Sequence, residues 1–203
     1  MADSVRSITL LAPPGRVTIT GQPASHLPAP GRVTVTGTLH WSGPAAAIAS
    51  AHQSGHLLRL AYRCAAGSPC SGNLRLTVPE GTAIVLDQPS GQVTLTALAG
   101  PLRITARSVD ITAARLRCPD LAATITSGHL SASFAAPPRS LAVMLRSAQA
   151  TVWLPGRTAY RLTQDVTAGY LRAAIPQDSR AARMVSARID SGELNLLPAA
   201  SSG

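Results

Sequence analysis

One short polar turn recurs at nearly equal intervals along the C-terminal part of this chain. Each copy is a Ser-Gly pair or a close variant of it, at residues 90–91, 108–109, 127–128, 147–148, 168–169 and 191–192. The first apolar residue after each turn advances by 18, 19, 20, 21 and 23 residues, through positions 93, 111, 130, 150, 171 and 194. Apolar and polar residues alternate on both sides of every turn, as they do in half-buried β-strands. A unit of this length without a helix cannot bury its own apolar face, so successive units must stack on one another.

The composition favours a narrow, regular core filled by small side chains. Hydrophobic residues make up 45% of the 203 residues but aromatic ones only 3%, so alanine, leucine, valine, isoleucine and threonine fill the core. Such residues favour strands, and the 16 glycines and 16 prolines leave no stretch suited to a long helix. The sequence therefore predicts an all-β fold, a right-handed parallel β-solenoid (β-helix) whose coils pair in parallel from residue 79 onward. A β-sandwich of hairpins is the alternative, and the nearly equidistant copies of one turn argue against it.

The N-terminal third follows a different pattern. Gly15–Gly21 recurs as Gly31–Gly37, and two further alternating strands are expected at 57–62 and 74–79. Ser54-Gly55 is typical of a hairpin turn. This part of the chain is therefore predicted to form a more antiparallel sheet.

One continuous domain is expected. Residues 1–78 start and cap the solenoid, residues 79–198 form the repeated coils, and residues 199–203 form a flexible tail. Eight inward positions are predicted to be buried in the core: Leu95, Ile104, Ile125, Leu130, Val143, Val152, Leu162 and Leu171.

Short motifs spread along most of the chain resemble those of a known family. They are the Ser-Gly-x-Val-like turns, Tyr62-Arg63-Cys64 followed by Cys70, Leu76–Thr82 and Ala99–Leu102. With these motifs in this order over residues 15 to 198, the chain resembles the bacterial putative-adhesin family of β-solenoid proteins, which is frequent in actinobacteria. The resemblance implies the β-solenoid fold and no defined activity, because the function of the family is unknown.

Three cysteines are present, and two of them flank one loop. Cys64 and Cys70 are separated by a turn between two apolar runs, which would bring them within disulfide reach. A reducing cytoplasm would instead keep both as thiols. Their spacing to His52 and His56 fits no zinc pattern, so we expect no metal and no cofactor. Cys118 is expected to lie apart and buried.

The turn positions of adjacent coils should form a column of side chains about 4.8 Å apart. This register makes Asp110 and His129 direct neighbours, and a hydrogen-bonded pair of this kind would serve as a general acid and base. Tyr170 occupies the same column. These three residues are weak candidates for catalysis, and the alternative is a solvated polar ladder. No nucleophile elbow, phosphate-binding loop, dinucleotide fingerprint or metal-ligand pattern occurs in the sequence.

The chain is strongly basic. It carries 18 arginines, no lysine and nine acidic residues, for a formal net charge of +9 at pH 7. Charge of this size favours contact with anions such as nucleic acid or acidic polysaccharide. Four outward arginines are predicted to line one anion-binding face: Arg103, Arg146, Arg161 and Arg188. The alternative is a compositional bias towards arginine on an ordinary solvated surface.

Two functions are compatible with these features. The first is a non-enzymatic solenoid scaffold or interaction protein that binds a protein, an anionic polymer or a second copy by end-to-end or face packing. The second is an enzyme that uses a groove on a solenoid face for small-molecule or carbohydrate chemistry. A concave groove around His129 would favour the enzyme, and a convex exposed column would favour the scaffold. With no signal peptide and no apolar run of 18 residues, we expect no transmembrane segment and a cytoplasmic protein.

Overall fold

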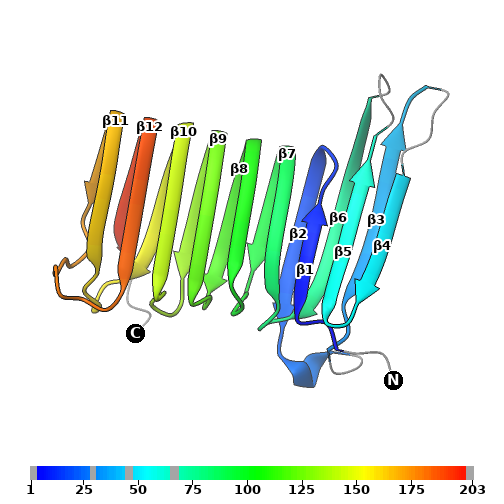
Figure 1. The fold of residues 1–203 in the computed structure, drawn as a ribbon, viewed down its shortest axis with the longest axis horizontal. Helices are drawn as coiled ribbons and strands as arrows, with labels where there is room; N and C mark the ends of the chain where they lie inside the picture. The colour runs from blue at the N-terminus through cyan, green and yellow to red at the C-terminus, as the bar shows by residue number, and fades with distance from the viewer. Residues whose placement is uncertain (1–3, 28–30, 44–47, 65–68, 200–203) are drawn as a thin grey trace.

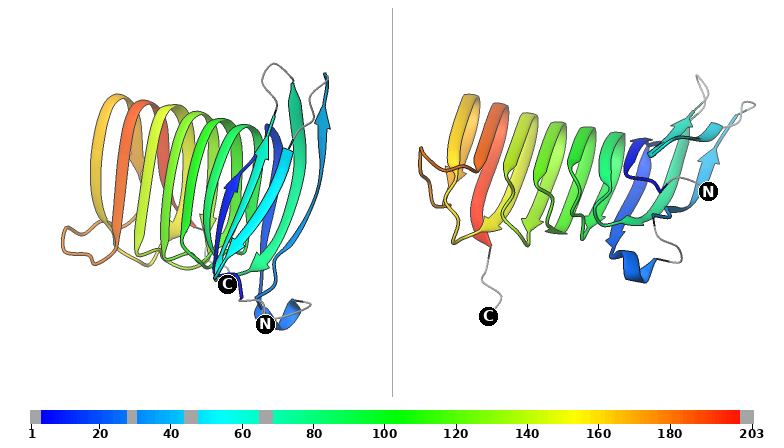
Figure 2. Two further views of the ribbon diagram at one scale, coloured as in Figure 1. Left: turned by 45° about the vertical axis from the view of Figure 1, so that its right-hand side comes forward. Right: turned by 60° about the horizontal axis from the view of Figure 1, so that its bottom comes forward.

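The structure, a computed structural model, describes residues 4–27, 31–43, 48–64 and 69–199. These residues contain twelve β-strands, all in one sheet, and one short 3-10 helix, η1 (Ala24–His26). The fold is all-β, and most strand pairs are parallel, as the sequence predicts. Figure 2 shows the chain winding in successive coils that stack along one axis. The tail expected from residue 199 lies, from residue 200 on, outside the described residues.

Four long strands form the middle of the stack. They are β7 (Ala83–Thr96), β8 (Leu102–Leu116), β9 (Asp120–Phe134) and β10 (Ser140–Pro155). Each pairs in parallel with the next, in a register that places the repeated turns side by side. Gly128 shows why such a turn uses glycine, because its φ is +108° and a Cβ there would overlap the carbonyl oxygen of Val109 on the neighbouring strand.

The last two strands do not follow the order of the chain. β12 (Met184–Ala199) lies between β10 and β11 (Arg161–Ala173), as the red strand between the yellow and orange ones in Figure 1 shows. The sequence-based prediction of consecutive coils is therefore wrong here. The inward residues of β12 are all apolar, whereas β11 places Gln164 opposite the buried Ala187, at an inward position. The more apolar coil is thus covered on both sides, and the more polar coil ends the stack.

The N-terminal end is rearranged in a similar way. Its strands are β1 (Ser7–Leu11), β2 (Gly15–Gln22), β3 (Thr34–Trp41), β4 (Ile48–Ser54), β5 (Leu57–Arg63) and β6 (Cys70–Pro79). β1 and β2 form a coil between β7 and the coil made by β5 and β6, and all of these pairs are parallel. Among the described strands, antiparallel pairing is confined to β3 with β6 and β4 with β5, and β4 joins β5 through the predicted hairpin at Ser54-Gly55. The N-terminal sheet is thus less antiparallel than expected.

The coils have two faces with the core between them. The first face is formed by β1, β4 and β5 together with the first halves of the long strands. The second face is formed by β2, β3 and β6 together with the second halves of the long strands. Among the described strands, β3 and β4 at one end and β11 at the other each pair with one neighbour. The sheet is therefore open at both ends of the stack.

The core follows the predicted alternation in the middle of the stack and weakens at the end. Six of the eight predicted core residues are buried: Leu95, Ile104, Ile125, Leu130, Val143 and Val152. Leu162 and Leu171 are only half-buried, because they lie on β11, where no further coil covers them.

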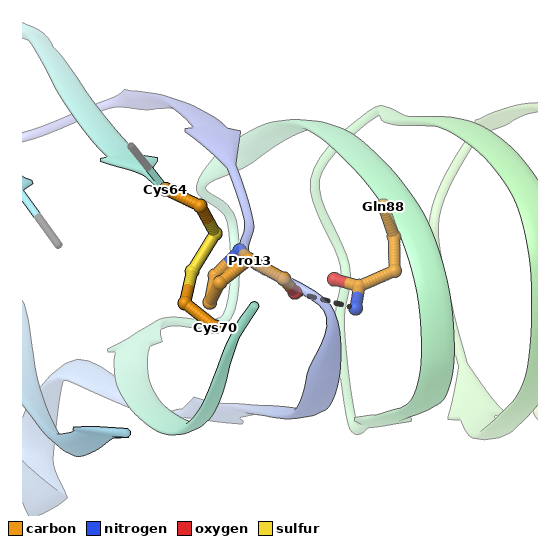
Figure 3. Close-up of a disulfide and its surroundings, with 4 residues drawn as sticks. All are labelled: Pro13, Cys64, Cys70 and Gln88. Carbon is orange, nitrogen blue, oxygen red and sulfur yellow. Dashed lines mark hydrogen bonds between the residues drawn. A yellow bond between two sulfur atoms is a disulfide. The ribbon is translucent and has the colours of Figure 1, made fainter. Parts of the chain in front are cut away.

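A disulfide and a buried hydrogen bond lie close together at one corner of the first coils (Figure 3). The structure joins Cys64 and Cys70 by a disulfide between β5 and β6, and Figure 3 shows Pro13 next to it. In the following coil the buried side chain of Gln88 points to the backbone of Pro13. Cys118 is buried and unpaired. The turn predicted at residues 65–68 lies outside the described residues.

Candidate functional site

Asp110 and His129 lie side by side on β8 and β9, as the register predicts. The Nδ1 of His129 is 3.1 Å from Oδ1 of Asp110, which is hydrogen-bond distance. The side chain of His129 is 67% exposed and that of Asp110 is 62% exposed, so the pair lies on an open surface and not in a groove. Water competes for every hydrogen bond at such a site, which weakens the case for an acid–base pair.

Tyr170 does not join this pair. It lies on β11 at the end of the stack, is 77% exposed and pairs with Glu193 of β12. Because β12 is inserted before β11, both Gln149 and Glu193 separate Tyr170 from His129 in the turn column. The three catalytic candidates therefore do not converge on one site.

The four predicted anion-binding arginines are exposed but spread over four strands. Arg103 borders a hollow of about 340 Å³ that Asp120 also lines. Arg188 forms ion pairs with Asp190 at 3.3 Å and Asp165 at 3.9 Å. Arg161 lies against the sulfur of Met184, and Arg146 stands just before the turn of β10. Carboxylates are interspersed among these arginines, so this surface is of mixed charge.

The positive charge is concentrated elsewhere, at the N-terminal end. Residues 4–79 contain six arginines and four histidines and no acidic residue. The other 12 arginines lie beyond residue 79 together with eight of the nine acidic residues. The first coils of the stack are therefore the region in which the fewest positive charges are balanced by acidic residues. The net charge of the whole chain does not reveal this distribution, although it can be read from the sequence.

A cleft of about 680 Å³ opens at this same end. Its walls are apolar side chains of two facing layers, with Val33 and Val35 on one side and Leu58, Leu60 and Tyr62 on the other. Arg32 also lines it. We call this space the end cleft.

The end cleft exists because β4 presents small side chains to the interior. Along one inward row the residues are Ile104, Leu86, Leu10 and Leu60 on successive strands, and the row ends at Ala51 on β4. Alanine leaves unfilled the volume that leucine occupies in the other coils. The alternation Ala-x-Ala-x-Gln over residues 49–53 was the sequence signal for this space, and the sequence analysis did not use it.

The end cleft contains one phenol hydroxyl, that of Tyr62. Burial raises the pKa of the Tyr62 hydroxyl, which therefore stays protonated and able to donate at ordinary pH. The described residues include no group of three or more His, Cys, Asp or Glu side chains placed to hold a metal ion. Nor do they include a helix long and apolar enough to span a membrane.

The fold and this site define an all-β protein with one open, mostly parallel sheet and an apolar cleft at one end. No family model and no curated protein matches the chain. Among solved structures, a putative cell adhesion protein from Clostridium sporogenes is similar over 98% of this chain and 94% of that chain. The two share 11% of their residues, with a TM-score of 0.46, so the likeness carries no argument about function.

Proposed function

We propose that this protein is a right-handed β-solenoid that works as a non-enzymatic scaffold or interaction protein and binds an anionic partner in its end cleft. The observation that carries the proposal is the exposed apolar interior in a region without acidic residues. Concave apolar surfaces of this size are typical of ligand sites. Uncompensated positive charge around such a site attracts anions and raises their rate of association.

The enzyme alternative has less support. Asp110 and His129 lie on an open surface, and Tyr170 lies at the opposite end of the stack from the end cleft. A groove that brings these side chains together with an apolar pocket would have favoured catalysis.

Binding of 8-anilinonaphthalene-1-sulfonate, an apolar fluorescent anion, tests the proposal. We expect saturable binding that weakens as salt rises, because the attraction between exposed charges is screened. Ala51→Leu narrows the end cleft at its inward row and should weaken binding by about tenfold or more. Ala135→Leu, at an exposed position after β9, is the matched control and should change nothing. Equal binding by the two variants would place the dye outside the end cleft and reject the proposed site.

A further inference from the structure

β4 is an open edge strand next to the end cleft. In the described part of the chain it pairs with β5 alone, and all seven of its side chains are exposed. Its outer edge therefore pairs with no other strand of the described residues. Such an edge is a template on which another extended segment can pair.

The inner side of β4 selects apolar side chains on an added strand. Ala49 and Ala51 face the end cleft, and their partners across the hairpin are Tyr62 and Leu60. Directly opposed residues share a face of a sheet, and alternate residues of a next strand would point into the same interior. They would occupy the volume that the two alanines leave open.

The outer surface of the β4–β5 hairpin favours negative charge on an added strand. His52 is paired with Arg59, and Ile48 is paired with Arg63, so cationic side chains lie on the outer surface of this hairpin. No carboxylate occurs between residues 4 and 79 to balance them. Acidic residues at the outward positions of an added strand would meet this charge.

We propose that the outer edge of β4 binds an extended segment of a partner protein in which apolar and acidic residues alternate. The segment adds as the next strand, with its apolar residues in the end cleft and its acidic residues beside His52, on the same surface as Arg59 of β5. This inference rests on the proposed function, because it uses the same cleft. Strand addition gains affinity from main-chain hydrogen bonds and specificity from the alternate side chains.

A second copy of the chain fits this edge less well. The exposed end strand β11 carries Arg161 and Asp165 on its first half, so it would place a cation as well as an anion near the arginines of the β4–β5 hairpin. The loop between β11 and β12 also extends past β11 at that end of the stack, as Figures 1 and 2 show. End-to-end packing would have to displace this loop, whereas a free peptide segment meets no such obstacle.

The probe is a fluorescein-labelled peptide of alternating valine and glutamate, as long as the seven residues of β4. We expect the alternating peptide to bind at least about tenfold more tightly than a peptide of the same composition arranged in two blocks. N-methylation of the valine amides and of the glutamate amides blocks opposite edges of the peptide. Strand addition predicts that one methylated peptide loses binding and the other keeps it.

Two charge reversals locate the site. Arg59→Glu should weaken binding of the valine–glutamate peptide and strengthen binding of a valine–lysine peptide. Arg146→Glu makes the same change in net charge on β10, away from β4, and should leave both peptides unaffected.

The outcomes separate the two proposals. If the fluorescent anion binds in the end cleft but the alternating and block peptides bind equally, or both methylated peptides retain binding, strand addition is wrong and the binding site stands. If neither the anion nor any peptide binds, both proposals are rejected. Equal losses from Arg59→Glu and Arg146→Glu would show attraction by net charge alone and would overturn the assignment to β4.

Discussion

The buried amide of Gln88 donates a hydrogen bond to the carbonyl of Pro13, at 3.0 Å, and a second to the carbonyl of Ser90, at 2.7 Å. Pro13 and Pro14 have no N–H group and cannot donate to the neighbouring coils. The side-chain amide of Gln88 supplies a hydrogen-bond donor at the point where the backbone of the adjacent coil lacks two N–H groups (Figure 3).

Gln88→Ala should therefore destabilise the protein by roughly 1–3 kcal/mol, because it leaves buried carbonyls without a donor. Urea unfolding followed by far-UV circular dichroism measures the change. Gln149→Ala, at an exposed turn position of β10, should stay close to wild type. A similar loss in both variants would show that the buried amide contributes little.

Replacement of the turn glycine in β9 tests the close approach between coils. Gly128→Ala must strain a backbone at φ +108° and move the carbonyl of Val109, at a cost of roughly 1–3 kcal/mol. Gly81→Ala is the control, since a Cβ there meets nothing within 4 Å. Thermal unfolding should show a clear drop in Tm for the first variant alone.

Core truncations should be costly in the middle of the stack and milder at its end. Ile125→Ala removes a fully buried side chain and should cost roughly 2–5 kcal/mol. Leu162→Ala should cost clearly less, because Leu162 lies on the end strand β11 and only β12 covers it, from one side. Equal losses in urea unfolding would argue that a further strand or partner covers β11 in solution.

Burial raises the pKa of the Cys118 thiol to about 12, so the folded protein keeps it protonated. It should resist alkylation at pH 8 and react only on unfolding. A thiol in the unfolded chain has a pKa of about 8.5. Above that pH the unfolded chain loses a proton that the folded chain retains, so the free energy of unfolding should fall as pH rises.

The same alkylation counts the thiols of the Cys64–Cys70 pair. With the disulfide intact, one thiol should be alkylated in denatured, unreduced protein, and three should be alkylated after reduction. Three thiols before reduction would show the pair reduced, which is the state expected in a reducing cytoplasm.

The repeat predicted much of the fold because its turn carries the register. Once the turns are aligned, the neighbours of each side chain follow, and the contact between Asp110 and His129 is predicted from spacing alone. The same reasoning predicted the buried residues of the inner coils, such as Ile125 and Val143.

The order of the end coils could not be read in this way. β11 and β12 carry equivalent turns at Gly169 and Gly192, so either fits against β10 by register. The choice depends on how well each inward row fills the core, and the inward row of β11 is the more polar one because it contains Gln164. The end cleft was missed for a related reason, since its cause is the small volume of Ala49 and Ala51 and not any motif.

The place of β12 constrains the time course of folding. β11 is synthesised first, yet its native neighbour is made only afterwards and must enter between β11 and β10. Either β11 stays undocked until β12 is complete, or it first occupies the site on β10 in a non-native pairing and is later displaced. Both routes delay the final step until residue 199 has been made. We therefore expect a slow late phase of folding, in which the inner coils are already formed and serve as the template.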